Sequence, residues 1–346
     1  DGPTDDHARD TAQWCLRCAN LYFLLLSFKI TVTIILQAFA LAALSTGSKG
    51  SRTESRMRRA QMKQMKRYCG AAIAAALIAG VIPAEANEHE GVEYEGVEFR
   101  VDVGAHALTF TERSSALGVE IETEMHTKGF AVDGEAAYTF PEIPVRLQLG
   151  FTTFQSSTDT EEVRVAGVLT QTQDLDDSFW VLSPALGYVA SLNETIKVTP
   201  LFGWDWQWIN QERDNIFILG VPLGIQVTEK IRGNGPVVGI RLAIDVTDKV
   251  QVNGHYSHSF LTHITAENSL AETLGFSEFE TDGDIDRVRL GIEYKLSNAV
   301  ALGLAYQFLQ NRRDESPVQT VGLVSAVLPE GVHRFHAGFA RLTIRF

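Results

Sequence analysis

Cysteine is scarce in this chain: three occur among 346 residues, and all lie before residue 70. Cys15 and Cys18 have C-x-x-C spacing, but no second pair follows, so the spacing does not predict a zinc site. The third is Cys69. Residues 87–346 contain none, which excludes disulfide bonds and thiol chemistry from that part of the chain.

Positive charge is also scarce after residue 86. Residues 87–346 hold 19 Lys and Arg against 37 Asp and Glu, a net charge of −18, whereas the whole chain carries −13. Proteins bind nucleic acids largely through contacts of Lys and Arg with phosphates. The charge balance therefore argues against a nucleic-acid partner.

Long apolar runs occur only near the start of the chain. The first, residues 21–45, is long enough for a membrane helix of about 20 residues, although Lys29 and Gln37 interrupt it. We interpret residues 1–56 as an upstream extension that is not part of the native protein. A membrane anchor over residues 21–45 is the alternative.

Residues 57–86 have the layout of a secretory signal peptide. Met57 and a positive segment at 63–67 precede the second apolar run, 71–82, and a small-x-small site, AEA, at 84–86. This run is too short to span a membrane stably. We expect cleavage after Ala86 and a mature chain of residues 87–346.

The stretch TPLFGWDWQWINQER (199–213) places Trp204, Trp206 and Trp208 on every second residue, with polar Asp205 and Gln207 between them. A period of two is the side-chain repeat of a β-strand. The alternation extends back to residue 196. That is longer than the usual ~5–6 residues of a globular strand and fits the ~9–11 of a strand that crosses a membrane.

The same alternation recurs along the mature chain and predicts ten strands. Their approximate limits are 97–111, 129–140, 145–155, 178–190, 195–209, 236–246, 249–262, 284–296, 299–310 and 332–346. Connections of two to four residues alternate with long ones at 112–128, 156–177, 210–235, 263–283 and 311–331. This pattern predicts an all-β fold, a ten-stranded antiparallel transmembrane β-barrel with short periplasmic turns and long extracellular loops.

A soluble β-sandwich is the alternative, because its strands also alternate. The predicted strands are too long for it, and the turns alternate strictly between short and long. The last residue is Phe346, at the end of an alternating segment Leu342-x-Ile344-x-Phe346. A closed barrel also leaves no unpaired strand edge in lipid.

Together, these segments resemble the Gram-negative outer-membrane β-barrel proteins. The resemblance covers the whole mature chain and implies location in the cell outer membrane, in contact with outer-membrane lipid and lipopolysaccharide. It also implies that Phe346 is read by the barrel-assembly machinery.

Aromatic residues are expected to form two girdles at the membrane boundaries, where an indole or phenol ring meets both lipid and water. The predicted outer girdle consists of Trp180, Trp204, Trp206 and Trp208. The predicted periplasmic rim consists of Tyr138, Phe140, Tyr188 and Phe346. A ligand-stacking platform is the alternative for the tryptophans, but they face away from the lumen.

The inward positions are rich in charge of both signs. The predicted lumen network contains Glu98, Arg100, Asp102, Asp133, Glu135, Arg146, Lys197, Asp205, Arg241, Asp245, Arg287, Arg289, Glu293 and Lys295. Ten strands leave little more than room for side chains, so these charges should pair and plug the barrel. A narrow small-solute channel is the alternative, whereas a wide pore is excluded because such pores use about 16–18 strands.

The ten-stranded architecture resembles the omptin proteases, which carry an Asp pair facing an Asp-x-His pair at the outer rim. Neither pair is present here. Asp159 and Glu162 follow the third predicted strand in STDTEE, and His263 follows the seventh. The resemblance therefore implies the architecture, while the catalytic residues of that family are missing.

Two further patterns are weak candidates for chemistry. His255 and Ser257 are similar to the His-x-Ser pair of lipid A deacylases, but their predicted face is the lumen. Asp282 and Asp284 approach calcium-loop spacing, yet Arg287 stands where that loop needs glycine. No cofactor is predicted.

The outer loops are acidic, and two of them contain apolar stretches at 215–227 and 318–328 that would extend the strands as hairpins or cover the mouth. The acidic surface predicts repulsion from neighbours, divalent-bridged contact with lipopolysaccharide, or a basic partner. We expect a non-enzymatic structural or adhesive outer-membrane protein. A surface hydrolase and a narrow channel remain the alternatives.

Overall fold

The computed structural model describes residues 96–115, 118–141, 143–156 and 158–346. The predicted upstream extension and signal peptide, residues 1–86, lie outside these ranges and stay predictions. Within the described ranges, no helix is both long and apolar enough to cross a membrane.

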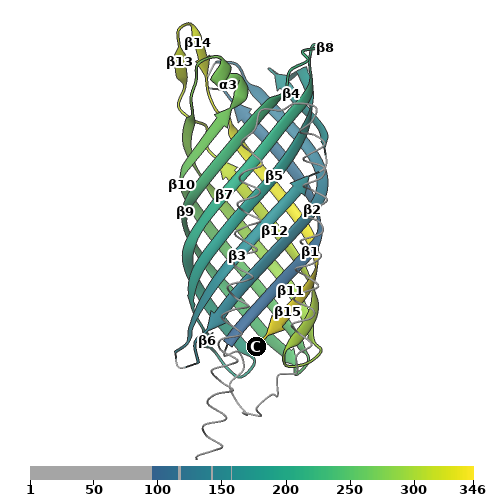
Figure 1. Ribbon diagram of the computed structural model, residues 1–346, viewed down its shortest axis with the longest axis vertical. Coiled ribbons are helices and arrows are strands. Elements are labelled where there is room, and N and C mark those ends of the chain that lie inside the picture. Colours follow the sequence, from purple (N-terminus) through teal and green to yellow (C-terminus); the bar gives the residue numbers. More distant parts are fainter. Residues whose placement is uncertain (1–95, 116–117, 142, 157) are drawn as a thin grey trace, which may run out of the picture. The chain divides into compact units, whose positions relative to one another are not determined.

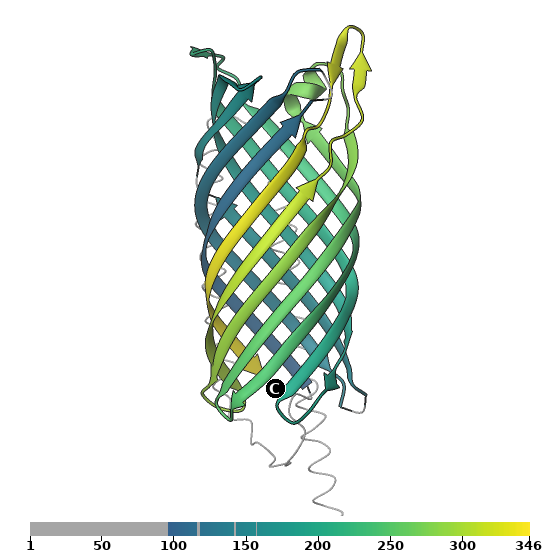
Figure 2. The same cartoon turned by 180° about the vertical axis from the view of Figure 1, so that it is seen from behind.

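The predicted ten-stranded antiparallel barrel is confirmed (Figures 1 and 2). Its strands are β1 (Gly96–Ser114), β2 (Ile121–Thr139), β3 (Val145–Ser156) with its continuation β4 (Asp159–Val165), β5 (Val168–Tyr188), β7 (Ile196–Ile218), β9 (Val227–Thr247), β10 (Val250–Asn268), β11 (Phe279–Lys295), β12 (Val300–Arg313) and β15 (Glu330–Arg345). Each strand pairs with its neighbour in sequence. The last strand, β15, pairs with β1 from Glu98↔Arg345 to Arg113↔Glu330, which closes the barrel.

Alternation decides which side chains face the lumen. On β1, Glu98, Arg100 and Asp102 are buried, whereas the side chains between them, Phe99 and Val101, face outward and are partly exposed. Outward apolar side chains continue around the barrel and would contact lipid acyl chains. Inward and outward positions of each strand therefore carry residues of different polarity.

Most strands are longer than predicted, and the predicted long loops are mostly strand. β1 ends at Ser114 and β2 begins at Ile121, both inside the predicted loop 112–128. β5 starts inside the predicted loop 156–177, and β7 ends inside the predicted loop 210–235. The reason is that period two persists while the outward residues become polar, as in Glu122, Glu124 and His126 of β2. The strands thus extend above the lipid, where water borders their outer face.

The tips of two long hairpins use tight turns with left-handed backbone. Ala166 and Gly167 join β4 to β5, with φ of 50° and 79°. Leu219 and Gly220 join β7 to the short strand β8 (Val221–Pro222), with φ of 50° and 80°. Two consecutive residues with positive φ are typical of hairpin turns whose twist matches the strands.

The apolar stretch 318–328 forms a separate hairpin, β13 (Gln319–Val321) with β14 (Val324–Ala326), at the extracellular end (Figure 1). A short helix, α3 (Ser269–Thr273), follows β10 and is capped by Asn268, which accepts bonds from the amides of Leu270 and Ala271. Phe276 and Phe279, just after α3, are buried. Phe276, Phe279 and Leu328 belong to the buried apolar cluster, whereas the turn of the β13–β14 hairpin projects into solvent with Leu323 fully exposed.

The periplasmic turns are short, as predicted, and side chains satisfy their backbone amides. Asn193, next to the two-residue strand β6 (Ala190–Ser191), accepts bonds from the amides of Thr195 and Ile196. At this end Phe346 exchanges two backbone bonds with Val97, of 2.9 and 3.2 Å. The terminal residue therefore takes part in closing the barrel.

Two glycines on the closing strands predict different responses to an added methyl group. A Cβ on Gly104 would lie 1.8 Å from the carbonyl oxygen of Gly338, whereas a Cβ on Gly338 would meet nothing within 4 Å. We expect Gly104→Ala to lower the free energy of unfolding by about 1–3 kcal/mol, and Gly338→Ala to leave it nearly unchanged. Urea unfolding of the barrel refolded in lipid measures both. Equal effects of the two variants would contradict this account of the β1–β15 contact.

Candidate functional site

The lower lumen is filled by a network of ion pairs. Arg341 lies fully buried and donates to both carboxylate oxygens of Asp102, each at 2.8 Å, and to Glu293 at 3.2 Å. Arg345 joins Glu98 and Glu293, at 3.0 and 3.1 Å. Each of these arginines on β15 therefore links its strand with β1 and β11.

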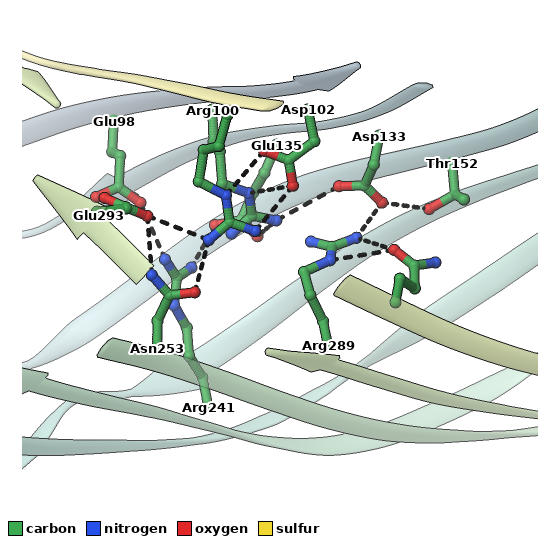
Figure 3. Close-up of polar contacts among 12 residues, drawn as sticks. Glu98, Arg100, Asp102, Asp133, Glu135, Thr152, Arg241, Asn253, Arg289 and Glu293 are labelled. Atoms are coloured by element: carbon green, nitrogen blue, oxygen red, sulfur yellow. Dashed lines mark hydrogen bonds and ion pairs between the residues drawn. The ribbon is translucent and has the colours of Figure 1, made fainter. Parts of the chain in front are cut away.

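Two carboxylates are shared among several guanidinium groups in the same layer, part of which Figure 3 shows. Glu135 contacts Arg100 at 2.9 Å and Arg146 at 2.8 Å, and it also pairs with Arg241. Glu98 accepts from Arg146 at 2.8 Å and from Arg241 at 3.2 Å. Desolvation of this many charges is compensated because each lies beside opposite charge.

The network continues upward along the lumen. Asp133 accepts from Thr152 at 2.6 Å and pairs with Arg289, which also donates to Gln307 at 2.9 and 3.1 Å (Figure 3). Asp205 pairs with Arg287 at 3.4 Å. At the periplasmic end, Lys295 and Asp245, also predicted as lumen charges, lie 3.1 Å apart.

Above the ion pairs, the lumen contains an apolar layer that the sequence analysis did not predict. Phe154 and Phe335 stack with ring centroids 4.2 Å apart and an interplanar angle of 11°. They belong to a cluster of side chains that includes Leu108, Phe110, Met125, Phe179, Ile209, Ile231, Leu261, Ile285 and Leu309, all at most 1% exposed. This layer spans the lumen between strands on opposite walls, and the imidazole rings of His106 and His333 pack within it against Phe335.

A second charged layer lies above the apolar one. Arg213 contacts Glu161 and Glu229, each at 2.9 Å, and Glu112 at 3.6 Å, while Arg313 contacts Glu112 at 2.7 Å. Arg213 lies five residues beyond the outermost girdle tryptophan on its strand, so this layer stands above the lipid. Burial lowers the pKa of Arg213, but the carboxylates of Glu161, Glu229 and Glu112 raise it well above its ordinary value.

Two of the five weak catalytic candidates line one cavity, and the other three lie elsewhere. His255 and Ser257 face the lumen, as predicted, and line a small cavity there with Asp205 and Arg287. Several polar atoms of these four side chains have no hydrogen-bond partner in the described part of the protein, which makes the cavity suitable for water. Acyl chains of the membrane have no access to it.

The loop candidates lie on strands, contrary to the prediction. Asp159 and Glu162 are on β4, where Glu162 pairs with Arg164 at 2.6 Å. His263 is on β10, and β5, β7 and β9 separate it from β4. No hydrogen bond or ion pair joins these three side chains to one another in the described part of the protein.

Asp282 and Asp284 were predicted near a loop mouth but lie within β11, where Asp284 pairs with Arg312 at 3.7 Å. Their backbone is that of an extended strand, whereas a calcium loop requires a curved backbone. Among the described residues, no group of three or more His, Cys, Asp or Glu is arranged to hold a metal ion.

The aromatic residues of the two predicted girdles lie in two groups along their strands, and the girdles themselves stay a prediction. Trp180 is directly opposite Trp208 across β5 and β7, and Trp204 and Trp206 are each 38% exposed. Tyr138, Tyr188 and Phe346 lie at the periplasmic ends of their strands and are also exposed.

The extracellular tip exposes a cluster of apolar side chains, which we call the apolar tip. It is formed by the β4–β5 and β7–β8 turns, which are joined by a backbone bond from Leu219 to Thr170. Leu219 is 75% exposed, and its exposed neighbours are Val168, Leu169, Phe217, Ile218, Val221, Leu223 and Ile225. Figure 1 shows this hairpin end, with β8, projecting above the barrel.

Carboxylates lie directly below the apolar tip. Asp174 is opposite Asp214, and Asp176 is opposite Glu212, on the outer face of β5 and β7. Burial, followed by the charges of Glu212, Asp176 and Asp174, raises the pKa of Asp214. We call these four side chains the acidic collar.

The comparisons with known proteins agree with the fold. The family model for the outer membrane protein beta-barrel domain matches residues 72–308. The chain belongs to this family, and it is an outer-membrane protein. No curated protein matches the sequence.

Among solved structures, the chain is similar to the outer membrane protease OmpT from Escherichia coli, with a TM-score of 0.54 and 9% identity over 74% of this chain and 99% of that chain. Two others are Neisserial surface protein A, at 15% identity, 73% and 100% coverage and TM-score 0.27, and the attachment invasion locus protein Ail of Yersinia pestis, at 10%, 72% and 99% and 0.27. The likeness to the protease concerns the fold alone.

The lumen network predicts a large penalty for removing one buried charge. We expect Arg341→Met to lower the free energy of unfolding by about 3–5 kcal/mol, because it leaves Asp102 buried without its main partner. Arg113→Met is the control, because it removes a pair with Glu122 of similar length, 2.7 Å, from an arginine that is 67% exposed. We expect this change to leave the free energy of unfolding nearly unaltered. Urea unfolding in lipid compares the two, and similar losses would contradict a structural role for the network.

Proposed function

We propose that this protein is a non-enzymatic outer-membrane barrel that binds another protein through its extracellular end. The apolar tip is the observation that carries the proposal. Soluble surfaces rarely expose contiguous apolar patches unless these take part in an interaction. The patch stands well above the lipid, so membrane insertion of the barrel does not explain it.

The filled lumen supports a role at the surface rather than in transport. Two layers of ion pairs with an apolar layer between them occupy the interior, and both require close contact between opposite walls. A narrow channel, the alternative considered from the sequence, would need a polar path through the layer that contains Phe154 and Phe335. The separation of Asp159, Glu162 and His263 gives the hydrolase alternative no support.

The chemistry of the tip indicates the chemistry of its partner. An apolar centre bordered by the acidic collar is complementary to a protein surface with an apolar centre and a basic rim. Basic side chains would relieve the repulsion between the opposed pairs Asp174–Asp214 and Asp176–Glu212. We therefore infer a protein partner of that kind.

This proposal predicts selective binding of an amphipathic basic ligand. The barrel in phosphatidylcholine nanodiscs is passed over three immobilised synthetic helical peptides of equal length, built from Leu and Lys, Leu and Glu, or Ser and Lys. We expect the Leu/Lys peptide to bind at least about tenfold more tightly than the other two, because it alone matches both the apolar tip and the collar. Empty nanodiscs provide the baseline.

Leu219→Asp with Leu223→Asp should abolish this preference. Leu192→Asp is the matched control, since Leu192 is 68% exposed but lies in a periplasmic turn. Equal binding of all three peptides, or equal loss with the control variant, would remove the support for a tip-mediated interaction.

A further inference from the structure

The extracellular end carries a second exposed apolar surface, formed by the β13–β14 hairpin and the helix α3. Leu323, at the turn of the hairpin, is fully exposed. The other large apolar side chains of this surface are 41–49% exposed: Val318, Val321, Val324, Leu270 and Leu274. We call these six side chains the apolar hairpin. Figures 1 and 2 both show the β13–β14 hairpin and the β7–β8 end projecting from opposite sides of the barrel.

The apolar hairpin is held in place by a buried base. Leu328, which follows the hairpin, and Phe276 and Phe279, which follow α3, are buried in the apolar cluster. Gln319 donates from Nε2 to the backbone oxygen of Glu278, at 2.8 Å, which ties the hairpin to the chain beyond α3. The exposed side chains take no part in this base. A contiguous apolar surface that the fold leaves uncovered is typical of an interaction site.

Arginines face outward on the three adjacent strands below the apolar hairpin. Arg312 lies on β12, Arg334 on β15 and Arg113 on β1, and each is exposed. Arg312 and Arg113 pair with carboxylates of the flanking strands β11 and β2, whereas Arg334 donates to Gln310 at 3.1 Å. Within β12, β15 and β1 themselves, Glu330 is the one carboxylate that faces outward. We call the three arginines the arginine face.

The arginine face and the acidic collar lie at the same height on opposite walls of the barrel. β15 is five strands from β7 in either direction around the sheet. Arg213 of β7 contacts Glu112 across the lumen at 3.6 Å, and Glu112 pairs with Gly331 of β15. The outward positions next to Arg213 are therefore level with those next to Gly331. Above the tryptophans, no Lys or Arg within β5 and β7 faces outward, so the two walls differ in the sign of their charge.

We propose that the partner of the apolar tip is a second copy of this chain, inserted beside it in the same membrane. The tip and collar of one barrel pack against the apolar hairpin and the arginine face of the next. This inference rests on the proposed function, because it identifies the protein whose apolar centre and basic rim fit the tip. Both copies are inserted to the same depth, so the two complementary surfaces meet at the same height.

The position of the two surfaces determines the kind of assembly. They differ from each other and lie on opposite walls, so the contact is heterologous. Each barrel can hold one neighbour at its tip and another at its hairpin, which produces rows rather than closed dimers. A symmetric contact between two tips is disfavoured, because it brings two acidic collars together. Insertion in one bilayer already fixes the axis of each barrel, so association costs less rotational freedom than it does in solution.

Single cysteines test which surfaces meet. Residues 87–346 contain no cysteine, so an introduced one is unique. Val221→Cys marks the apolar tip and Leu323→Cys marks the apolar hairpin, both at exposed positions. The two variants are reconstituted in phosphatidylcholine vesicles, singly and mixed at the same total protein-to-lipid ratio, and treated with a short bismaleimide cross-linker. Leu192→Cys, in a periplasmic turn, measures chance collisions, and heat-modifiable migration on a gel verifies that each variant is folded.

We expect the mixed sample to yield at least about tenfold more cross-linked dimer than either variant alone, because only the mixture can join a tip to a hairpin. A barrel that carries both cysteines should give a ladder of trimers and longer products. The Leu/Lys peptide should lower the yield of the mixed sample, since it competes for the tip, whereas the Leu/Glu peptide should not.

Equal yields in the mixed and single samples, or a tip-to-tip product as abundant as the mixed one, would overturn the proposal. The peptide assay uses barrels isolated one to a nanodisc, so it does not depend on association between copies. Selective binding of the Leu/Lys peptide without the mixed product would mean that the tip takes a different protein. That result removes this inference and leaves the proposed function intact, whereas failure of both assays removes both.

Discussion

Hydrocarbon offers no hydrogen bonds to a peptide group, and this constraint determines the architecture. A sheet in lipid must pair every strand edge, which here requires β15 to return to β1 along sixteen pairs from Glu98↔Arg345 to Arg113↔Glu330. Phe346 adds two further backbone bonds to Val97 at the periplasmic end of this seam. Outward side chains then have to suit lipid, and the inward ones share a narrow space cut off from it.

The narrow interior explains why charge pairing and closure go together. Arg341, Glu135 and Glu98 would be costly to bury alone, so each is surrounded by opposite charge from several strands. The apolar layer around Phe154 and Phe335 separates this lower network from the upper one at Arg213. With the interior occupied, the surface left for binding is outside, at the apolar tip with its collar.

The ten strands and most of the lower lumen charges could be predicted because period two reports directly on sidedness. The strand ends could not, because above the lipid both faces of a strand contain polar residues and hydrophobic contrast fades. Glu112 and Arg213 nevertheless keep the inward parity of Asp102 and Asp205, so following parity past the last outward apolar residue would have found them. How far Asp159 lies from His263 depends on where their strands stand around the barrel. The apolar layer depends on which inward positions of distant strands lie at the same height. Neither can be read from the sequence of a single strand.

The central claim is that side chains seal the lumen of a membrane-inserted barrel. Conductance of the refolded 87–346 protein in a planar lipid bilayer tests it most directly. The account predicts no stepwise current above the lipid baseline over hours of recording at moderate voltage, with insertion verified independently by protease protection. Stable, reproducible open-channel steps would contradict it, because ions cannot pass the closed layer formed by Phe154, Phe179 and Phe335.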